Sequence, residues 1–115
     1  MKENIILTKT FAFSLEIIKY CEILHSEKKF VIANQLLKSG TSIGANVREA
    51  QNSESKNDFI HKLKIAAKEI EETNYWLELC QHSENYPDCE KLISELKEIE
   101  NITNKIIITL KTKAG

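Results

Sequence analysis

The chain has 115 residues, 42% of them hydrophobic, with one proline, three glycines and a formal net charge of -1. This length suits a single domain over residues 1–115 that buries about two thirds of its unfolded surface. No window reaches the roughly 18 apolar residues that a bilayer span requires, and three cysteines without a CxxC pair make a poor disulfide framework. The sequence therefore predicts a soluble, reduced, cytoplasmic protein with no membrane segment.

Four runs of apolar residues recur at spacings of three and four, the pattern of one buried helix face. These runs lie within residues 6–24, 28–51, 59–80 and 92–110. Ser55, with Asp58 three residues later, suits the N-terminal cap of the third helix, and Pro87 suits the first turn of the fourth. Because short loops join them, we expect an all-α, antiparallel up-down-up-down four-helix bundle.

The stretch 39–46, SGTSIGAN, holds two glycines at the spacing of a phosphate-cradling loop. A nucleotide-binding loop requires Lys and Ser or Thr after its last glycine, and a dinucleotide-binding turn requires a preceding strand. Instead, Ala45 and Asn46 follow, and the helical periodicity continues through the stretch. We therefore expect Gly40 and Gly44 on a buried helix stripe that another backbone approaches closely. Either close packing offsets the cost of about 1 kcal/mol per mid-helix glycine, or the helix kinks there. The stripe comprises Phe30, Ala33, Leu37, Gly40, Gly44 and Val47.

Residues suited to catalysis or metal binding are few. An up-down bundle would gather five of them at one end: Cys21, His25, Cys80, His82 and Cys89. Their spacings are irregular, and free cysteine commonly behaves as a small buried hydrophobe. No Ser or Cys shows a nucleophile motif, and no histidine has an acid partner visible in the sequence. We expect a non-enzymatic protein with no catalytic residue, metal or cofactor; a metal-dependent enzyme using these five residues is a third, distant hypothesis.

Charge is unevenly distributed along the chain. Residues 28–68 contain eight basic and three acidic side chains, whereas residues 69–100 contain two basic and ten acidic ones. Antiparallel folding would gather the basic residues Arg48, Lys56, Lys62, Lys64, Lys105, Lys111 and Lys113 at one end. It would gather the acidic residues Glu71, Glu72, Glu78, Glu84, Asp88, Glu90 and Glu95 at the other. The basic end suits nucleic-acid phosphates or complementary subunit contacts; ordinary solvated helix faces are the alternative.

Self-association is indicated by the aromatic residues and by apolar residues outside the strict stripes. Tyr75 and Trp76 are adjacent, so one helix face can fully bury at most one of them, and both residue types are enriched at interfaces. Four further residues suggest more apolar surface than one core absorbs. They are Leu36, Ile43, Ile60 and Ile65.

Two segments, QLLKSGTSIGANVREAQ (35–51) and NDFIHKLKIAAKEIEETNYWLEL (57–79), closely resemble the four-helix-bundle proteins encoded by intervening sequences in bacterial large-subunit ribosomal RNA genes. The resemblance implies a ring-like homopentamer. It also implies kinship with the accessory variability protein of diversity-generating retroelements, which binds nucleic acid and a reverse transcriptase through basic surfaces. Matching positions implied for such a role are Arg48, Lys62 and Lys68.

The sequence thus predicts a non-enzymatic homo-oligomer that acts as an RNA-binding or scaffold module, with RNA or a nucleic-acid enzyme as its partner. Candidates for nucleic-acid binding are Arg48, Lys56, Lys62, Lys64 and Lys68. Candidates for packing or for a subunit interface are Gly40, Gly44, Tyr75 and Trp76. The alternative is a structural or protein-binding oligomer without nucleic-acid affinity.

Overall fold

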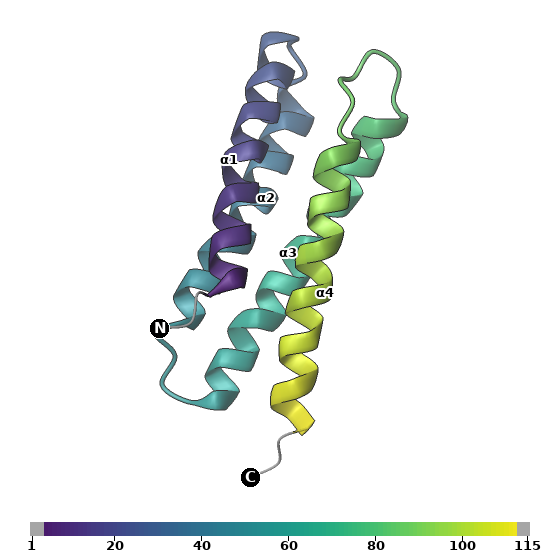
Figure 1. The fold of residues 1–115 in the computed structure, drawn as a ribbon. Helices are drawn as coiled ribbons and strands as arrows, with labels where there is room; N and C mark the ends of the chain where they lie inside the picture. The colour runs from purple at the N-terminus through teal and green to yellow at the C-terminus, as the bar shows by residue number, and fades with distance from the viewer. Residues whose placement is uncertain (1–3, 113–115) are drawn as a thin grey trace.

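The computed structural model describes residues 4–112, and this part of the chain forms four α-helices and no strand. They are α1 (Ile5–Ser26), α2 (Phe30–Ala50), α3 (Lys56–His82) and α4 (Glu90–Thr112). Each helix packs on its neighbour in the chain and α4 also packs on α1, whereas the backbones of α1 and α3 lie farther apart at opposite corners. Loops 27–29 and 83–89 lie at the upper end of Figure 1, and loop 51–55 lies at the lower end. None of the four helices is both long and apolar enough to cross a membrane.

Short polar residues begin two of the helices. The Asn4 side chain accepts a hydrogen bond from the backbone N–H of Leu7 at 3.4 Å. Ser55 accepts one from the N–H of Asp58 at 3.0 Å, which confirms the predicted cap of α3. The second helix begins at Phe30 rather than at residue 28, because Lys28 adopts a left-handed conformation with φ of 64° in the turn after α1.

The loop before α4 differs from the prediction. Since α4 begins at Glu90, Pro87 lies outside its first turn. The Pro87 carbonyl instead accepts a hydrogen bond of 2.6 Å from the Tyr20 hydroxyl of α1. The Cys89 N–H donates to Gln81 Oε1 of α3 at 2.7 Å. These two bonds fix loop 83–89 against two different helices.

Helix α2 buries a wider face than the single predicted stripe. Leu36 and Ile43 are fully buried, whereas Phe30 is exposed and Leu37 is only partly buried. The physical reason is that α2 packs on both α1 and α3, so its apolar face spans two neighbours. The expectation that Leu36, Ile43 and Ile60 supply surplus apolar surface is therefore wrong, because all three are buried.

Helices α1 and α2 approach each other closely along the octet 39–46, which lies inside one continuous helix rather than in a loop. A β-carbon at Gly40 would lie 2.9 Å from Cγ2 and 3.0 Å from Cγ1 of Ile17. Gly44 is only partly buried, contrary to the expectation, although a β-carbon there would lie 3.3 Å from the Thr10 carbonyl oxygen and from Ser14 Oγ. The absent side chain at position 40 thus makes room for a fully buried, β-branched residue.

We expect Gly40→Ala to destabilise the fold. Its gain in helix propensity is about 1 kcal/mol, while overpacking against the stiff Ile17 side chain costs about 1–3 kcal/mol. Chemical denaturation of Gly40→Ala, Ile17→Ala and the double variant measures both the cost and the coupling. Ile17→Ala should cost less when Ala occupies position 40, because the new methyl group fills part of the cavity. A more stable Gly40→Ala variant would contradict the close contact.

Candidate nucleic-acid interface

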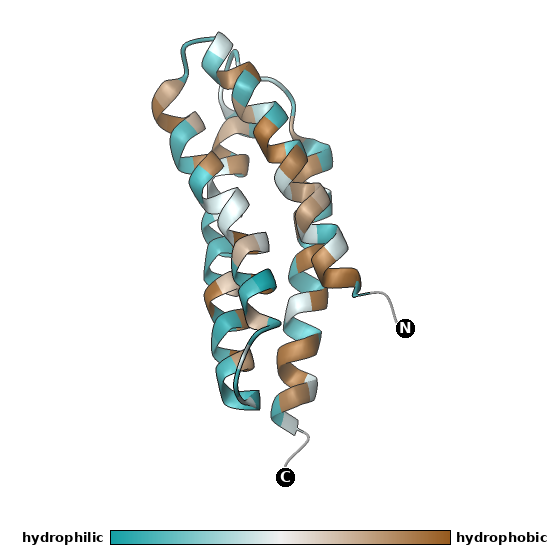
Figure 2. Ribbon diagram, turned by 90° about the vertical axis from the view of Figure 1, so that its left-hand side faces the viewer, coloured by the Kyte–Doolittle hydropathy of each residue, from teal (hydrophilic) through white to brown (hydrophobic). Residues whose placement is uncertain are grey.

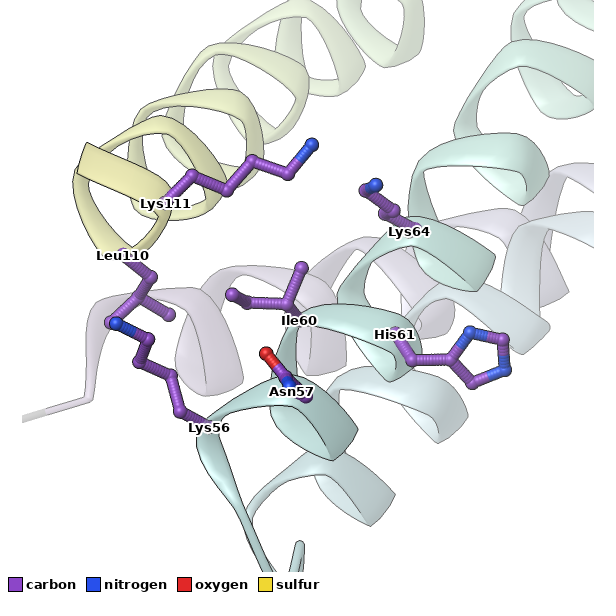
Figure 3. Close-up of a pocket in the computed structure, with 7 residues that line it drawn as sticks. All are labelled: Lys56, Asn57, Ile60, His61, Lys64, Leu110 and Lys111. Carbon is purple, nitrogen blue, oxygen red and sulfur yellow. The ribbon is translucent and has the colours of Figure 1, made fainter. Parts of the chain in front are cut away.

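Basic residues from α3 and α4 line a surface depression at the lower end of the bundle. The basic residues are Lys56 and Lys64 of α3 and Lys111 of α4, and we call the depression the lysine cleft. Its other lining residues are Asn57, Ile60, His61 and Leu110. Figure 3 shows Lys64 and Lys111 pointing toward each other across the gap between the helices, whereas the His61 ring points away from Lys111.

The two facing ammonium groups repel each other. The pKa of Lys64 is lowered from its usual 10.5, first by its contact with Lys111 and by the like charge of that group, and then by slight desolvation. Among residues 4–112, neither Lys64 nor Lys111 forms an ion pair with a carboxylate. The fold therefore holds a concentrated positive charge that its described residues do not neutralise.

The predicted nucleic-acid-binding residues are only partly brought together. Lys56 and Lys64 meet in the lysine cleft, while Lys62 pairs with Glu49 of α2 at 3.4 Å. Arg48 lies on α2 with its guanidinium carbon 5.6 Å from the centre of the Phe11 ring, a cation–π contact. Lys68 is exposed on α3 and does not line the cleft.

Lys111 joins the cleft although sequence reasoning placed it only at the basic end. Its position in the last turn of α4 is favourable in any helix, since a cation there complements the helix dipole. What the sequence could not reveal is its partner, because the pairing depends on how α3 and α4 align. Lys113, also assigned to the basic end, lies outside the described residues.

The upper end also carries basic residues, so the predicted charge polarity is diluted. Lys28 and Lys29 lie in loop 27–29, at the same end of the bundle as loop 83–89, which contains Glu84 and Asp88 (Figure 1). The Lys29 ammonium lies 4.8 Å from the centre of the Tyr86 ring and 3.3 Å from a carboxylate oxygen of Glu27. Lys29 therefore already has partners, which distinguishes it from Lys64 and Lys111 in the lysine cleft.

Helix α1 exposes apolar side chains that the sequence analysis did not single out. Phe11, Leu15 and Ile18 are 53%, 47% and 39% exposed, and we call them the α1 face. Figure 2 shows hydrophobic residues recurring along α1. Small residues of α2 line a groove beside this face, among them Thr41, Gly44 and Ala45. The spacing of three and four that marked α1 as amphipathic does not reveal that its second face is also apolar.

The aromatic pair of α3 is only partly covered. Trp76 is half-buried against the core, and its indole N–H donates to Glu72 Oε2 at 3.0 Å. Tyr75 is 57% exposed, and its ring meets the Trp76 ring edge to face at 5.3 Å between centroids. Together with the exposed Leu79, one turn further on, they form what we call the α3 patch.

The family of the chain follows from its sequence once this architecture is clear. A family model described as "23S rRNA-intervening sequence protein" matches residues 2–107. The chain belongs to this family. A crystal structure of a protein of unknown function from the S23 ribosomal protein family of Bacteroides thetaiotaomicron VPI-5482 is similar, with 42% identity and a TM-score of 0.85. The match covers 89% of this chain and 97% of that one. No curated protein matches the chain.

In this intervening-sequence protein the three thiols are buried rather than arranged as a reactive site. Burial raises the pKa of Cys21 to about 12 and that of Cys89 to about 11, and it also raises the pKa of Cys80. The Cys89 thiol donates to the Leu77 carbonyl at 3.2 Å. Within residues 4–112 no group of three or more His, Cys, Asp or Glu side chains is arranged to hold a metal ion. At neutral pH these thiols are protonated and act as core residues.

Proposed function

We propose that this intervening-sequence protein is a non-enzymatic, homo-oligomeric, antiparallel bundle that acts as an RNA-binding or scaffold module in the cytoplasm. The observation that carries the proposal is the lysine cleft, where two ammonium groups face each other without a carboxylate partner among the described residues. A nucleic-acid backbone would supply the missing negative charge. The family name connects these proteins with 23S rRNA, which favours RNA over other polyanions.

A nucleic-acid enzyme is the second partner under this proposal. The same two segments that resemble the intervening-sequence family suggest kinship with the accessory variability protein of diversity-generating retroelements. By that analogy a reverse transcriptase would be the bound enzyme. The exposed cation Lys68, which lies outside the lysine cleft, would extend the contact surface, whereas Arg48 contacts Phe11 of the α1 face. The alternating positions of the loops in Figure 1 support the antiparallel order of the helices.

Self-assembly as a ring is favoured by the location of the exposed apolar residues. A closed ring with an odd number of subunits needs head-to-tail contacts, so each subunit must offer two different surfaces. The α1 face and the α3 patch are two such surfaces, and they belong to helices at opposite corners of the bundle. Aromatic and aliphatic residues of this kind are typical of interface centres. A homopentamer would use both surfaces in every subunit.

RNA binding is tested by mobility shift with structured and single-stranded RNA. We expect retention at low salt and release between low and physiological ionic strength, because binding displaces counterions. The double variant Lys56→Gln/Lys64→Gln should bind roughly tenfold more weakly. Lys38→Gln/Lys91→Gln removes the same charge outside the cleft and serves as the control. If wild-type protein retains no RNA even at low salt, the RNA-binding function is rejected.

Assembly is tested by measuring mass in solution. We expect wild-type protein at five times the mass of the chain, and a smaller species for Leu15→Glu and for Tyr75→Glu, because each would bury an unpaired charge in the ring contact. Val31→Glu changes an exposed apolar residue outside both surfaces and should leave the mass unchanged. Monomeric wild-type protein would contradict the proposed ring.

The runner-up function is a structural or protein-binding oligomer without nucleic-acid affinity. The observation that favours it is the extent of the α1 face, which could hold a second copy or another protein without any help from the lysines. The two measurements above separate the candidates. A pentamer that ignores RNA at low salt supports the runner-up, whereas a pentamer that retains RNA supports the leading proposal.

A further inference from the structure

Lys64 and Lys111 are exposed lysines of two neighbouring helices, and they point toward each other across the lysine cleft. Both side chains are long and flexible, and like charges in water gain by moving apart. In the structure they point toward each other over the gap between α3 and α4, and Ile60 lines the same cleft (Figure 3). Ile60 is only 8% exposed, so a largely buried apolar side chain forms part of the lining of the cleft.

We propose that Lys64 and Lys111 form a clamp that binds one phosphate group between their ammonium groups. A phosphate group carries several acceptor oxygens, and each ammonium group has three N–H donors, so one group can accept from both lysines at once. Charge-assisted bonds of this kind are the stronger class of hydrogen bond. The bound anion would turn the repulsion between the lysines into two attractions.

The remaining residues of the lysine cleft define what the clamp accepts. Lys56, from the first turn of α3, adds a third cation at the rim beside Leu110. The nearby side chains of Asn57 and His61 are polar, and none of the residues lining the cleft is acidic. The chemistry of the site therefore selects anions, and its open side leaves room for the rest of a chain that carries the phosphate.

The phosphate could belong to an RNA backbone or be free in solution. The clamp would bind an RNA phosphodiester and a free phosphate by the same chemistry. The clamp therefore rests on the proposed RNA-binding function only where RNA supplies the phosphate. RNA would have the advantage, since other cations of the protein could contact neighbouring phosphates of the same strand. Free phosphate would meet the clamp alone.

The pKa of Lys64 is a measurable property that reports on the pair. Its pKa lies below 10.5 because of Lys111, and the charged groups that line the same cleft are Lys56 and Lys111, with His61 as the other titratable group. An anion between the lysines favours the charged form and raises that pKa. Lys111→Gln should also raise the pKa of Lys64, because the repelling charge is removed. Because that repulsion is lost, Lys111→Gln should not lower the thermal stability of the protein.

The experiment uses side-chain nuclear magnetic resonance of the full chain, with the lysine Cε signals assigned by Lys64→Gln, Lys111→Gln and the control Lys91→Gln on the same helix as Lys111. Inorganic phosphate and a short single-stranded RNA are titrated separately, against chloride at matched ionic strength. We expect the Lys64 and Lys111 signals to move with phosphate and with RNA, but not with chloride. We also expect Lys64→Gln and Lys111→Gln to bind RNA about threefold to tenfold more weakly than Lys91→Gln.

The outcomes separate the clamp from the broader function. Movement with RNA alone assigns the clamp to a backbone phosphodiester, and movement with both ligands assigns it to phosphate in general. If phosphate moves both signals while wild-type protein retains no RNA, the clamp stands and the RNA-binding function fails. If RNA is retained but the Lys64 and Lys111 signals behave like that of Lys91, the clamp is overturned while RNA binding stands.

Discussion

The contact between Gly40 of α2 and Ile17 of α1 is the constraint on which the rest of this bundle depends. Ile17 is fully buried and leaves no room for a β-carbon at position 40. A glycine costs free energy in a helix, but because it has no side chain the two helices can pack densely, which offsets that cost. Helix α2 packs on α3 with its other side, where Thr73 donates a hydrogen bond of 2.9 Å to Ser39 in the buried interface.

Much of this architecture could be predicted from the sequence, because helical periodicity is a local property. The four apolar runs and the Ser55 cap correspond to observed helices and to an observed hydrogen bond. The predictions that were wrong needed knowledge of the neighbours. Leu36 and Ile43 were assigned to surplus surface because a single stripe ignores the second helix that α2 contacts. Pro87 was assigned to a helix because nothing local to it indicates the hydroxyl of Tyr20.

The candidate site was less predictable than the fold, because it too depends on which helices become neighbours. A charge count along the chain found the basic end, but the count cannot tell a lysine with a partner from one without. Lys62 proves to be paired with Glu49, while Lys64 faces Lys111 from a distant part of the sequence. The sequence pattern also does not indicate the apolar α1 face, because the spacing of three and four identifies only the buried stripe of the helix. The proposed function therefore depends on two surfaces, the lysine cleft and the α1 face, that only the packed helices define.

The salt dependence of RNA binding tests this account most directly. The slope of the logarithm of the binding constant against the logarithm of salt concentration counts the phosphates that the protein neutralises. The account predicts that Lys111→Gln reduces the magnitude of this slope by about 0.7 on single-stranded RNA, the contribution of one neutralised phosphate charge, while Lys91→Gln leaves it unchanged. Equal slopes for wild-type protein and Lys111→Gln would show that RNA does not reach the lysine cleft, and would contradict the account.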